Sequence, residues 1–471
     1  MRGDQKMGER NIERVGRRDL LRLTGAGAAM LLTRRACGAE AEPVKRKPNI
    51  VVIVADDLGY ADIGVHGCKD IPTPHIDLLA RNGVRCTDAY VSCPVCSPSR
   101  AGFLTGRYQQ RFGHWYNPGP AAQASAQFGL PLTEATLADV LKRAGYVTGM
   151  VGKWHLGLKP EFHPMKRGFD EFFGFLHGSH SYIDPQADKF NLILRGTEPV
   201  DKKEYLTDAF TREAVRFVER HRSSPFFLYL SYNAVHTPMQ APDMYLERFP
   251  DINEGKRRRY AAMLSAMDDG VGKVLDALRA AGVGDDTLVM FFSDNGGPPQ
   301  ANASSNTPLR GSKGTVWEGG IRVPMLMQWP RRIPQGTVYS QPVIALDTFA
   351  TCAAAAGAAV PTDRTVDGVD LVPYLTGRKQ DVPHEMLFWK WHDGDVVRKG
   401  NWKLLRSSAG SRALYDLSSD IGETNDVAHE HPEMVDQLVT ALKAWWSELQ
   451  PPLWERGGRS RPRGRPARRP R

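Results

Sequence analysis

Four short runs of apolar residues in the first three hundred positions constrain the fold more than any other feature of the sequence. The first, Asn49–Ala55, reads Asn-Ile-Val-Val-Ile-Val-Ala and lacks the apolar–polar alternation of a strand with one wet face. The other runs are 146–151, 225–230 and 287–292. Between them, apolar residues recur at helical spacing in 132–144 and 260–281. We therefore predict an α/β fold, with a large, mixed but mostly parallel sheet flanked by helices.

The pattern changes beyond about residue 345. Short strand-like segments separated by Gly- and Asp-containing turns follow at 386–391, 395–398, 402–406 and 413–417. A helical pattern comes next, at 432–449. These features predict a small antiparallel sheet with one helix. We accordingly predict a main domain over 42–345 and a C-terminal subdomain over 346–450.

Both ends of the chain are predicted to lie outside the folded part. Arg17-Arg18-Asp19-Leu20-Leu21-Arg22 resembles a twin-arginine export signal, and the apolar run 23–32 after it is far shorter than the ~20 residues that span a bilayer. We predict a removable signal over 1–41, an exported (periplasmic or secreted) protein and no membrane span; a disordered basic leader is the alternative. The Arg- and Pro-rich tail 451–471 has no apolar face to bury and is predicted to be disordered.

The net charge of +9 comes from these ends. Residues 456–471 contain eight arginines and no acid, and residues 1–41 carry a net charge of +4, which leaves −3 for residues 42–455. A slightly acidic folded part gives no reason to predict a nucleic-acid enzyme. Six cysteines in 471 residues are too few for a disulfide scaffold.

Carboxylate and amide side chains follow two of the predicted strands. Asp56 and Asp57 come directly after the first run, and Asp294 and Asn295 follow the run 287–292. Ligands in open α/β sheets bind beyond the carboxyl ends of the strands, and oxygen donors of this kind suit Ca²⁺ or Mg²⁺ rather than Zn²⁺. Taken singly, each pair could equally start a turn.

Basic and titratable side chains follow the other two strands. Lys153 and His155 come after 146–151, and His236 comes after 225–230, while Lys313 lies on a loop between two glycines. A lysine suits an anion, and a histidine can act as a general acid or base. A solvated surface side chain is the alternative for each of them.

The segment from Cys96 to Arg107 reads Cys-Ser-Pro-Ser-Arg-Ala-Gly-Phe-Leu-Thr-Gly-Arg. Pro98 suits a first helical turn, so we expect residue 96 near a helix N-terminus, where free N–H groups favour an anion. Arg100 lies one turn later on the same side. A nucleophile, a helix end and an arginine together suit the transfer of a sulfuryl or phosphoryl group.

Cys93 and Cys96 also form a CxxC pair, which could be a redox pair or half of a zinc site. No second CxxC exists, and a redox pair explains neither Arg100 nor the strand-end carboxylates. Only Cys96 has a proline two residues later and an arginine four residues later.

These motifs resemble the signatures of the type I, formylglycine-dependent sulfatases. Cys-Ser-Pro-Ser-Arg with Leu-Thr-Gly-Arg resembles the first signature, and Gly145-Tyr146-Val147-Thr148 with Gly152-Lys153-Trp154-His155 resembles the second. The blocks at 56–60, 294–296 and 313 follow in the family's order, so that the resemblance covers about residues 48–330. Within the family it points to relatives of arylsulfatase A and N-acetylgalactosamine-6-sulfatase.

The resemblance implies the alkaline phosphatase superfamily fold and a set of roles. Cys96 is expected to be oxidised to formylglycine (3-oxoalanine) by a maturation enzyme, and its hydrated aldehyde to attack sulfur. One Ca²⁺ ion is expected on Asp56, Asp57, Asp294, Asn295 and residue 96. The side chains expected to bind the sulfate oxygens are those of Arg100, Lys153 and Lys313. His236 is expected to protonate the leaving alcohol, and His155 to help remove the proton from the second hydroxyl.

The substrate implied by the resemblance is a sulfated carbohydrate or an aryl sulfate. A phosphomonoester, phosphodiester or phosphonate hydrolase of the same fold is one alternative, and a non-catalytic protein that binds sulfated glycans is another. The segments 115–128 and 176–190 are candidates for the wall that selects the sugar.

Overall fold

The structure is a computed structural model that describes residues 47–119, 128–184, 189–201, 203–392, 394–407 and 409–456. The predicted signal over 1–41 and residues 457–471 of the Arg-rich tail lie outside these residues, as do parts of both candidate wall segments. The start of the tail is ordered, contrary to the prediction for 451–471, because Trp454 is buried and the Leu453 N–H donates to the Gly113 carbonyl at 2.9 Å. One compact unit starts at Lys47. No helix among the described residues is long and apolar enough to cross a membrane.

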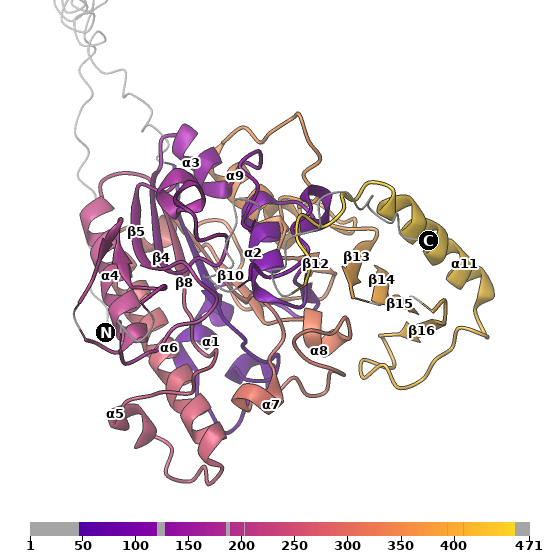
Figure 1. The fold of residues 1–471 in the computed structure, drawn as a ribbon, viewed down its shortest axis with the longest axis horizontal. Coiled ribbons are helices and arrows are strands. Elements are labelled where there is room, and N and C mark those ends of the chain that lie inside the picture. The colour runs from indigo at the N-terminus through magenta and orange to yellow at the C-terminus, as the bar shows by residue number, and fades with distance from the viewer. Residues whose placement is uncertain are drawn as a thin grey trace, which may run out of the picture. The chain divides into compact units, whose positions relative to one another are not determined.

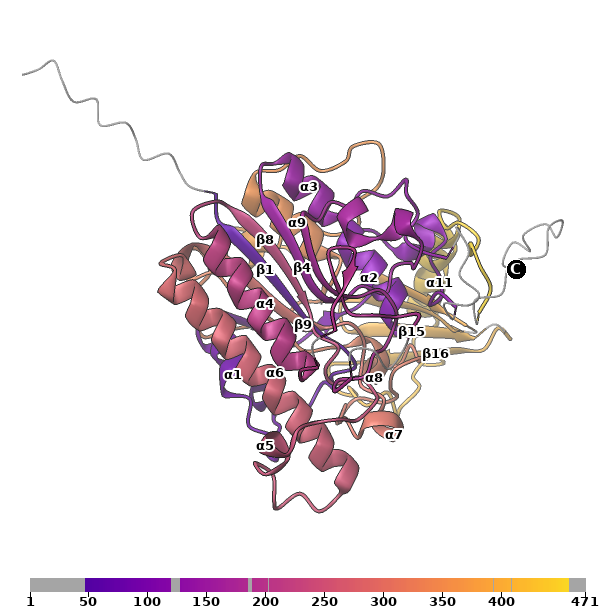
Figure 2. The same cartoon turned by 60° about the vertical axis from the view of Figure 1, so that its left-hand side comes forward.

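A ten-stranded sheet forms the centre of this unit (Figures 1 and 2). Its strand order is β11-β2-β10-β9-β1-β8-β4-β5-β6-β7. The central strands β9, β1, β8, β4 and β5 run parallel, and antiparallel strands join at both sides. In chain order the strands are β1 (Asn49–Ala55), β2 (Val84–Cys86), β4 (Val147–Lys153), β5 (Glu171–Phe175), β6 (Leu194–Arg195), β7 (Glu198–Pro199), β8 (Phe226–Ser231), β9 (Thr287–Ser293), β10 (Met325–Gln328) and β11 (Thr337–Tyr339). The predicted mixed, mostly parallel sheet is confirmed.

Helices cover both faces of this sheet, as Figure 2 shows. Val51 and Ile53 of β1 point into a core shared with α1 (Pro74–Arg81), α4 (Leu206–His221) and α6 (Gly255–Ala280). Ile50 and Val52 point to the other core, with α2 (Cys96–Thr105), α3 (Leu137–Arg143) and α9 (Asp347–Ala356). Because successive side chains of β1 enter different cores, every residue of the strand must be apolar, which explains the continuous run.

Several predicted boundaries differ from the structure by a few residues, and two of them concern the site. The helix predicted over 132–144 begins only at Leu137, because Thr136 and Asp139 form a reciprocal capping box at its N-terminus. Glu134, inside the predicted helix, instead pairs with Arg107 at 2.7 Å. The strand predicted over 146–151 extends to Lys153, so this lysine is the last strand residue rather than part of the following loop.

The small C-terminal sheet consists of four antiparallel strands, as predicted (Figure 1). They are β13 (Leu387–Trp391), β14 (Gly394–Lys399), β15 (Trp402–Ser407) and β16 (Arg412–Asp416), and α11 (Pro432–Trp446) packs on them. Apart from short 3-10 helices, the remaining described elements are β3 (Ala89–Tyr90), β12 (Val343–Ile344), α5 (Asp243–Leu246), α7 (Pro299–Asn302), α8 (Glu318–Ile321) and α10 (Val372–Leu375). Helices α9 and α10 follow residue 345 but pack against the large sheet. The domain boundary at 345 stays a prediction.

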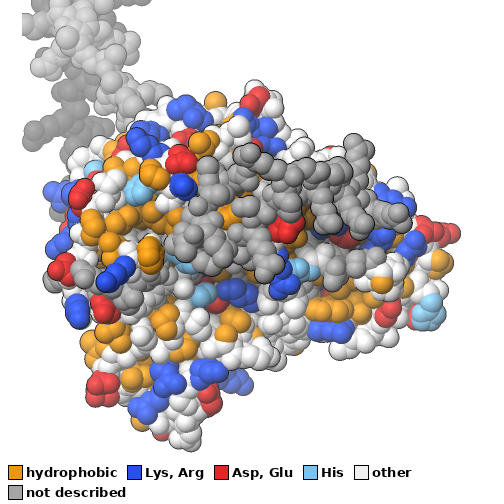
Figure 3. All heavy atoms as spheres, viewed as in Figure 1, with side chains coloured by type: hydrophobic (Ala, Val, Ile, Leu, Met, Phe, Trp, Pro, Cys, Tyr) orange, Lys and Arg blue, Asp and Glu red, His pale blue; other side chains and the backbone are white. Residues whose placement is uncertain are grey.

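Buried ion pairs join the two sheets. Lys403 of β15 lies between Glu318 of α8, at 2.8 Å, and Glu423, at 2.7 Å, and all three side chains are fully buried. Asp88 pairs with Arg322 and, at 2.6 Å, with Arg398 of β14. We call these six residues the seam network: Asp88, Glu318, Arg322, Arg398, Lys403 and Glu423. Charges of both signs are interspersed over the face in Figure 3, in line with the small net charge of residues 42–455.

Candidate active site

Cys96 is the first residue of α2, as the sequence predicted. Val95 before it has an extended backbone, and Asn117 Oδ1 accepts the Ser97 N–H at 3.0 Å. The Cys96 side chain is only 1% exposed. This burial raises the pKa of the Cys96 thiol to about 12, against the opposite effect of Lys153 and Lys313. As a cysteine, residue 96 is therefore a protonated thiol at neutral pH.

The carboxylates meet because β1 and β9 are neighbours in parallel register. Ala55 pairs with Ser293, so the residues that follow them, Asp56 and Asp294, lie side by side. Asp294 Oδ1 accepts the Asp57 N–H at 3.3 Å, and Asn295 Nδ2 donates to Asp57 Oδ1 at 2.7 Å. All four side chains are buried. The structure thus brings together the oxygen donors that the sequence placed at two separate strand ends.

Three cations face these carboxylates. Arg100 Nε and Nη2 donate to Asp294 Oδ2 at 2.9 and 2.7 Å. Lys153 Nζ donates to Asp56 Oδ2 at 2.5 Å, and Lys313 Nζ donates to Asp57 Oδ1 at 2.6 Å. Burial by itself raises the pKa of Asp294, but Arg100 and Lys153 outweigh it and hold that pKa below its usual value. We call these six residues the strand-end cluster: Asp56, Asp57, Arg100, Lys153, Asp294 and Lys313.

The Cys96 sulfur lies within this cluster. Lys313 Nζ is 3.3 Å and Asp56 Oδ1 is 3.5 Å from Sγ. Residue 96 therefore sits beside a lysine at a helix N-terminus, and both of these favour an anion next to it, against the opposite effect of the Asp56 carboxylate.

The two predicted histidines lie at the same edge. His236 Nε2 is 3.6 Å from Asp57 Oδ2, and its Nδ1 contacts the Thr237 carbonyl at 2.6 Å. Because a carbonyl only accepts, Nδ1 carries a proton and Nε2 is the atom that can exchange one. His155 has a left-handed backbone, and its Nδ1 has no hydrogen-bond partner among the described residues. Burial, with Lys153 beside it, holds the pKa of His155 well below the usual value, so this imidazole is neutral.

Some residues of the site were not predicted. Ser231 Oγ and Tyr229 Oη of β8 accept from Arg100 Nη1 at 2.5 and 3.1 Å and fix the guanidinium from the side opposite Asp294. They are alternate residues of one strand and so share a face, a signal that strand periodicity carries. Ser97 Oγ is also hydrogen-bonded to His114 Nε2 at 2.7 Å. No sequence motif predicts this pair.

The donor set fits a hard divalent cation. Among the described residues, Asp56, Asp57, Cys96 and His236 each offer a ligand atom within 4.8 Å of the others. Asn295 Oδ1 is buried and has no hydrogen-bond partner among the described residues, as expected of an atom that binds an ion. A second acidic group, His75, Asp268 and Asp269, has a structural explanation, because Asp268 accepts the His75 and Ile76 N–H groups at the start of α1.

The CxxC pair forms no disulfide, and all five cysteines of the described residues are free.

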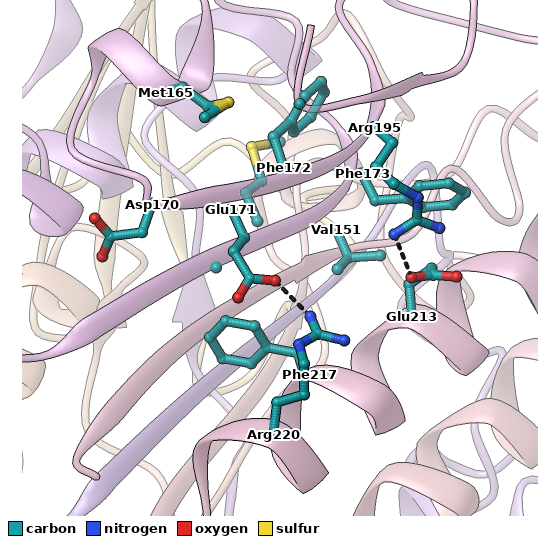
Figure 4. Close-up of a pocket in the computed structure, with 13 residues that line it drawn as sticks. Val151, Met165, Asp170, Glu171, Phe172, Phe173, Arg195, Glu213, Phe217 and Arg220 are labelled. Atoms are coloured by element: carbon teal, nitrogen blue, oxygen red, sulfur yellow. Dashed lines mark hydrogen bonds and ion pairs between the residues drawn. The ribbon is translucent and has the colours of Figure 1, made fainter. Parts of the chain in front are cut away.

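The cavity in Figure 4 is distinct from the strand-end cluster. It has a volume of about 370 Å³ and lies between β4, β5 and α4. Arg220 pairs with Glu171 there and Arg195 with Glu213, and none of the predicted site residues lines it.

Comparison with known proteins gives the family. Residues 48–358 match the Sulfatase family, and residues 312–450 match the family described as N-sulphoglucosamine sulphohydrolase, C-terminal. The N-acetylgalactosamine-6-sulfatase of Mus musculus is 37% identical over 400 residues, which are 80% of this chain and 75% of that protein. The steryl-sulfatase of Mus musculus is 33% identical over 532 residues, 88% of this chain and 84% of that protein.

A solved structure supports the same assignment. The structure of Ps i-CgsB in complex with k-i-k-neocarrahexaose has a TM-score of 0.82 and 39% identity, and covers 87% of this chain and 95% of that chain. The family, the curated relatives and this fold agree with the chemistry of the strand-end cluster. The chain therefore belongs to the sulfatase family and is a hydrolase of sulfate esters.

Proposed function

We propose that this protein is a calcium-dependent sulfatase that uses a formylglycine made from Cys96 and acts on sulfated carbohydrate. The observation that carries the proposal is the position of the Cys96 sulfur, 3.3 Å from Lys313 Nζ and 3.5 Å from Asp56 Oδ1, at a helix N-terminus. Oxidised to the aldehyde formylglycine and then hydrated by one water molecule, residue 96 would carry two hydroxyls, one of which would act as the nucleophile. The oxidation needs a maturation enzyme.

Arg100, Lys153 and Lys313 neutralise the sulfate oxygens. Their cationic atoms surround residue 96 from α2, the end of β4 and the Gly-flanked loop. Such preorganised cations stabilise charge that develops in the transition state, because they need no reorganisation when the reaction occurs.

The two histidines move protons. His236 holds its Nδ1 proton against the Thr237 carbonyl, which leaves Nε2 to donate to the oxygen of the departing alcohol. His155 is buried and neutral and accepts a proton from the oxygen substituents of residue 96. Splitting the roles between two histidines lets one act as an acid while the other acts as a base.

The metal proposed here is Ca²⁺, held by Asp56, Asp57, Asp294, Asn295 and residue 96. The unpartnered Asn295 Oδ1 and the carboxylate of Asp57, which accepts from Asn295 Nδ2 at 2.7 Å, support oxygen ligation. The ion would supply positive charge that aligns the sulfate and residue 96. Asp294 lies beside the group of candidate ligands rather than in it, because Arg100 holds its Oδ2.

Sulfated carbohydrate is the proposed substrate class. The N-acetylgalactosamine-6-sulfatase relative and the complex of Ps i-CgsB with a neocarrahexaose both point to carbohydrate. We also propose export by the twin-arginine-like signal over 1–41, a sulfatase catalytic domain over 42–345 and a C-terminal subdomain over 346–450.

Mass spectrometry of the peptide that contains residue 96, together with sulfate release from a sulfated oligosaccharide, tests the nucleophile. We expect the mass of formylglycine in active protein and no sulfate release by Cys96→Ala. Cys93→Ala is the matched control, since it removes the other thiol of the CxxC pair and should leave both signals intact. An unmodified thiol at position 96 in fully active protein would refute the proposal.

Chelation tests the metal. Treatment with a chelator should lower sulfate release at least tenfold, and Ca²⁺ should restore it better than Zn²⁺. Thermal unfolding followed with and without Ca²⁺ should show stabilisation, about 2.7 kcal/mol when the free ion is at a hundred times its Kd. Rescue by Zn²⁺ alone would contradict the calcium assignment.

A further inference from the structure

We infer that the small C-terminal sheet positions Lys313, with Trp391 as the main positioning residue and Arg310, Glu423 and Lys403 as further ties. This inference rests on the proposed role of Lys313 in binding sulfate. Arg100 and Lys153 belong to a helix and a strand of the large sheet, and neither side chain is exposed. Lys313 lies on a loop, and its side chain is 19% exposed. The position of the Lys313 ammonium therefore depends on the contacts that hold its loop.

The loop contains a local turn, in which Thr315 Oγ1 accepts the Ser312 N–H at 3.2 Å and donates to the Ser312 carbonyl at 2.7 Å. Two of its other positions are glycines, which add conformational freedom. Gly311 and Gly314, on either side of Lys313, both have left-handed backbones, with φ of 80° and 83°. Glycine pays the largest conformational entropy when it is fixed in one state. Lysine adds four rotatable side-chain bonds, so the place of Nζ depends on how well the loop backbone is held.

Trp391 of β13 holds the middle of the loop. Its Nε1–H donates to the Gly314 carbonyl at 2.8 Å, next to Lys313. The Gly314 N–H donates in turn to the Pro94 carbonyl at 2.9 Å, two residues before Cys96. Gly314 is therefore fixed between the C-terminal sheet and the segment that carries the nucleophile.

Glu423 holds both ends of the loop. Arg310 Nη1, at the start, donates to the Glu423 carbonyl at 2.7 Å, and the Glu318 N–H, at the end, donates to Glu423 Oε2 at 2.7 Å. Lys403 lies between the buried carboxylates of Glu318 and Glu423. Without this ammonium the two carboxylates would repel each other, and the end of the loop would move away from Glu423.

A loosened loop would shift Lys313 Nζ from Asp57 and Cys96, where it makes contacts of 2.6 and 3.3 Å. A displacement of about 1 Å can lower a rate about a hundredfold when the group acts in the transition state. We therefore expect the effect in kcat more than in KM, because the proposed role of Lys313 is to stabilise charge that develops in the transition state.

A double-mutant cycle on the full-length matured enzyme tests the inference. Trp391→Phe removes the hydrogen bond to Gly314 and keeps an aromatic ring, and Lys313→Met removes the ammonium. We expect Trp391→Phe to lower kcat for a sulfated oligosaccharide about tenfold alone, but less than twofold in the Lys313→Met background. Arg310→Met, which removes the tie at the exposed start of the loop, should behave in the same way.

Trp402→Phe is the matched control. Trp402 belongs to the same small sheet and packs on the His431 ring at 4.7 Å, away from the loop, so this variant should keep the wild-type kcat. Urea unfolding of each variant separates a positioning effect from lost stability.

The outcomes separate the inference from the proposed function. An equal loss in both backgrounds, or no loss with Trp391→Phe in the wild-type background, would overturn the positioning role. Full activity of Lys313→Met would overturn the proposed role of Lys313 itself, and with it the reason for the ties.

Discussion

The strand-end cluster and the seam network contain the same numbers of positive and negative charges, and in both every charge has a partner of opposite sign, but they differ in what surrounds them. Each consists of three carboxylates and three cations, and most of these side chains are buried. In the seam network every charged group has an ion-pair partner within the network. Around the strand-end cluster, Asn295 Oδ1 and His155 Nδ1 lack partners among the described residues, and the side chains of Lys313 and His236 are 19% and 18% exposed. The seam network is enclosed and stabilises the joint between the two sheets. The strand-end cluster borders unpartnered and partly exposed polar atoms, so it can bind a further ion and a substrate.

The largest effect is expected in the seam network, from Lys403→Met. Methionine has about the same length but no charge, so the buried carboxylate of Glu423 loses its ion pair with Lys403, and that of Glu318 keeps only its pair with Arg322. We expect the free energy of unfolding to fall by about 3 to 5 kcal/mol, measured by urea denaturation at pH 7. Adding Glu318→Gln and Glu423→Gln should recover part of the loss, because no buried charge is then unpaired. A loss below about 1 kcal/mol would show that the seam is not a stabilising joint.

Arg100→Lys in the strand-end cluster should lower activity and leave stability almost unchanged. The charge next to Asp294 is kept, but the forked geometry that reaches Asp294, Ser231 and Tyr229 is lost. We expect kcat/KM for sulfate release to fall about 10² to 10³-fold, with a melting temperature close to that of the wild type. Activity within a few-fold of the wild type would mean that the guanidinium does not act on the sulfate.

These two regions also show how far the sequence could predict the molecule. The buried strands were predicted to within two residues, because a strand that enters two cores shows a continuous apolar run. The strand-end carboxylates were visible because they follow such runs. The seam network was not visible, since Glu318, Lys403 and Glu423 resemble surface charges. Glu318 lies 85 residues before Lys403 and 105 residues before Glu423 along the chain, so no local pattern links them.

The dependence of stability on pH gives a smaller effect, which tests the seam network. Burial alone raises the pKa of Glu318, but Lys403, together with Arg322 and Arg398, outweighs it and brings the pKa down to about 2. A depressed carboxyl pKa stabilises the folded state above the unfolded value of 4.5, and this contribution is lost as pH falls toward 2.

Glu318→Gln should therefore remove up to about 1.4 kcal/mol per pH unit from the slope of stability with pH in this window. Urea denaturation at pH 7, 4 and 3 should show the curves of wild type and variant converging as pH falls. Parallel curves would indicate that another carboxyl dominates acid unfolding.

The smallest effect is expected at the rim of the cavity in Figure 4. Arg220 and Glu171 form an ion pair there, and both side chains are more than a third exposed. Solvent screens such a pair, so Arg220→Ala should change the free energy of unfolding by less than about 1 kcal/mol and leave sulfate release unchanged. A change in sulfate release would show that this cavity contributes to the reaction.

The burial of Cys96 has a consequence for the timing of synthesis. In the folded chain the residue is 1% exposed and lies under Lys313, so a maturation enzyme cannot reach its sulfur, and the proposed oxidation must precede folding. Lys313 follows Cys96 by 217 positions, which at about 5 to 20 residues per second corresponds to about 10 to 40 s of translation. The C-terminal sheet that fixes the Lys313 loop emerges later still. Because Lys313 and the C-terminal sheet are synthesised after Cys96, the sulfur of Cys96 stays accessible for the proposed oxidation until these later segments have folded over it.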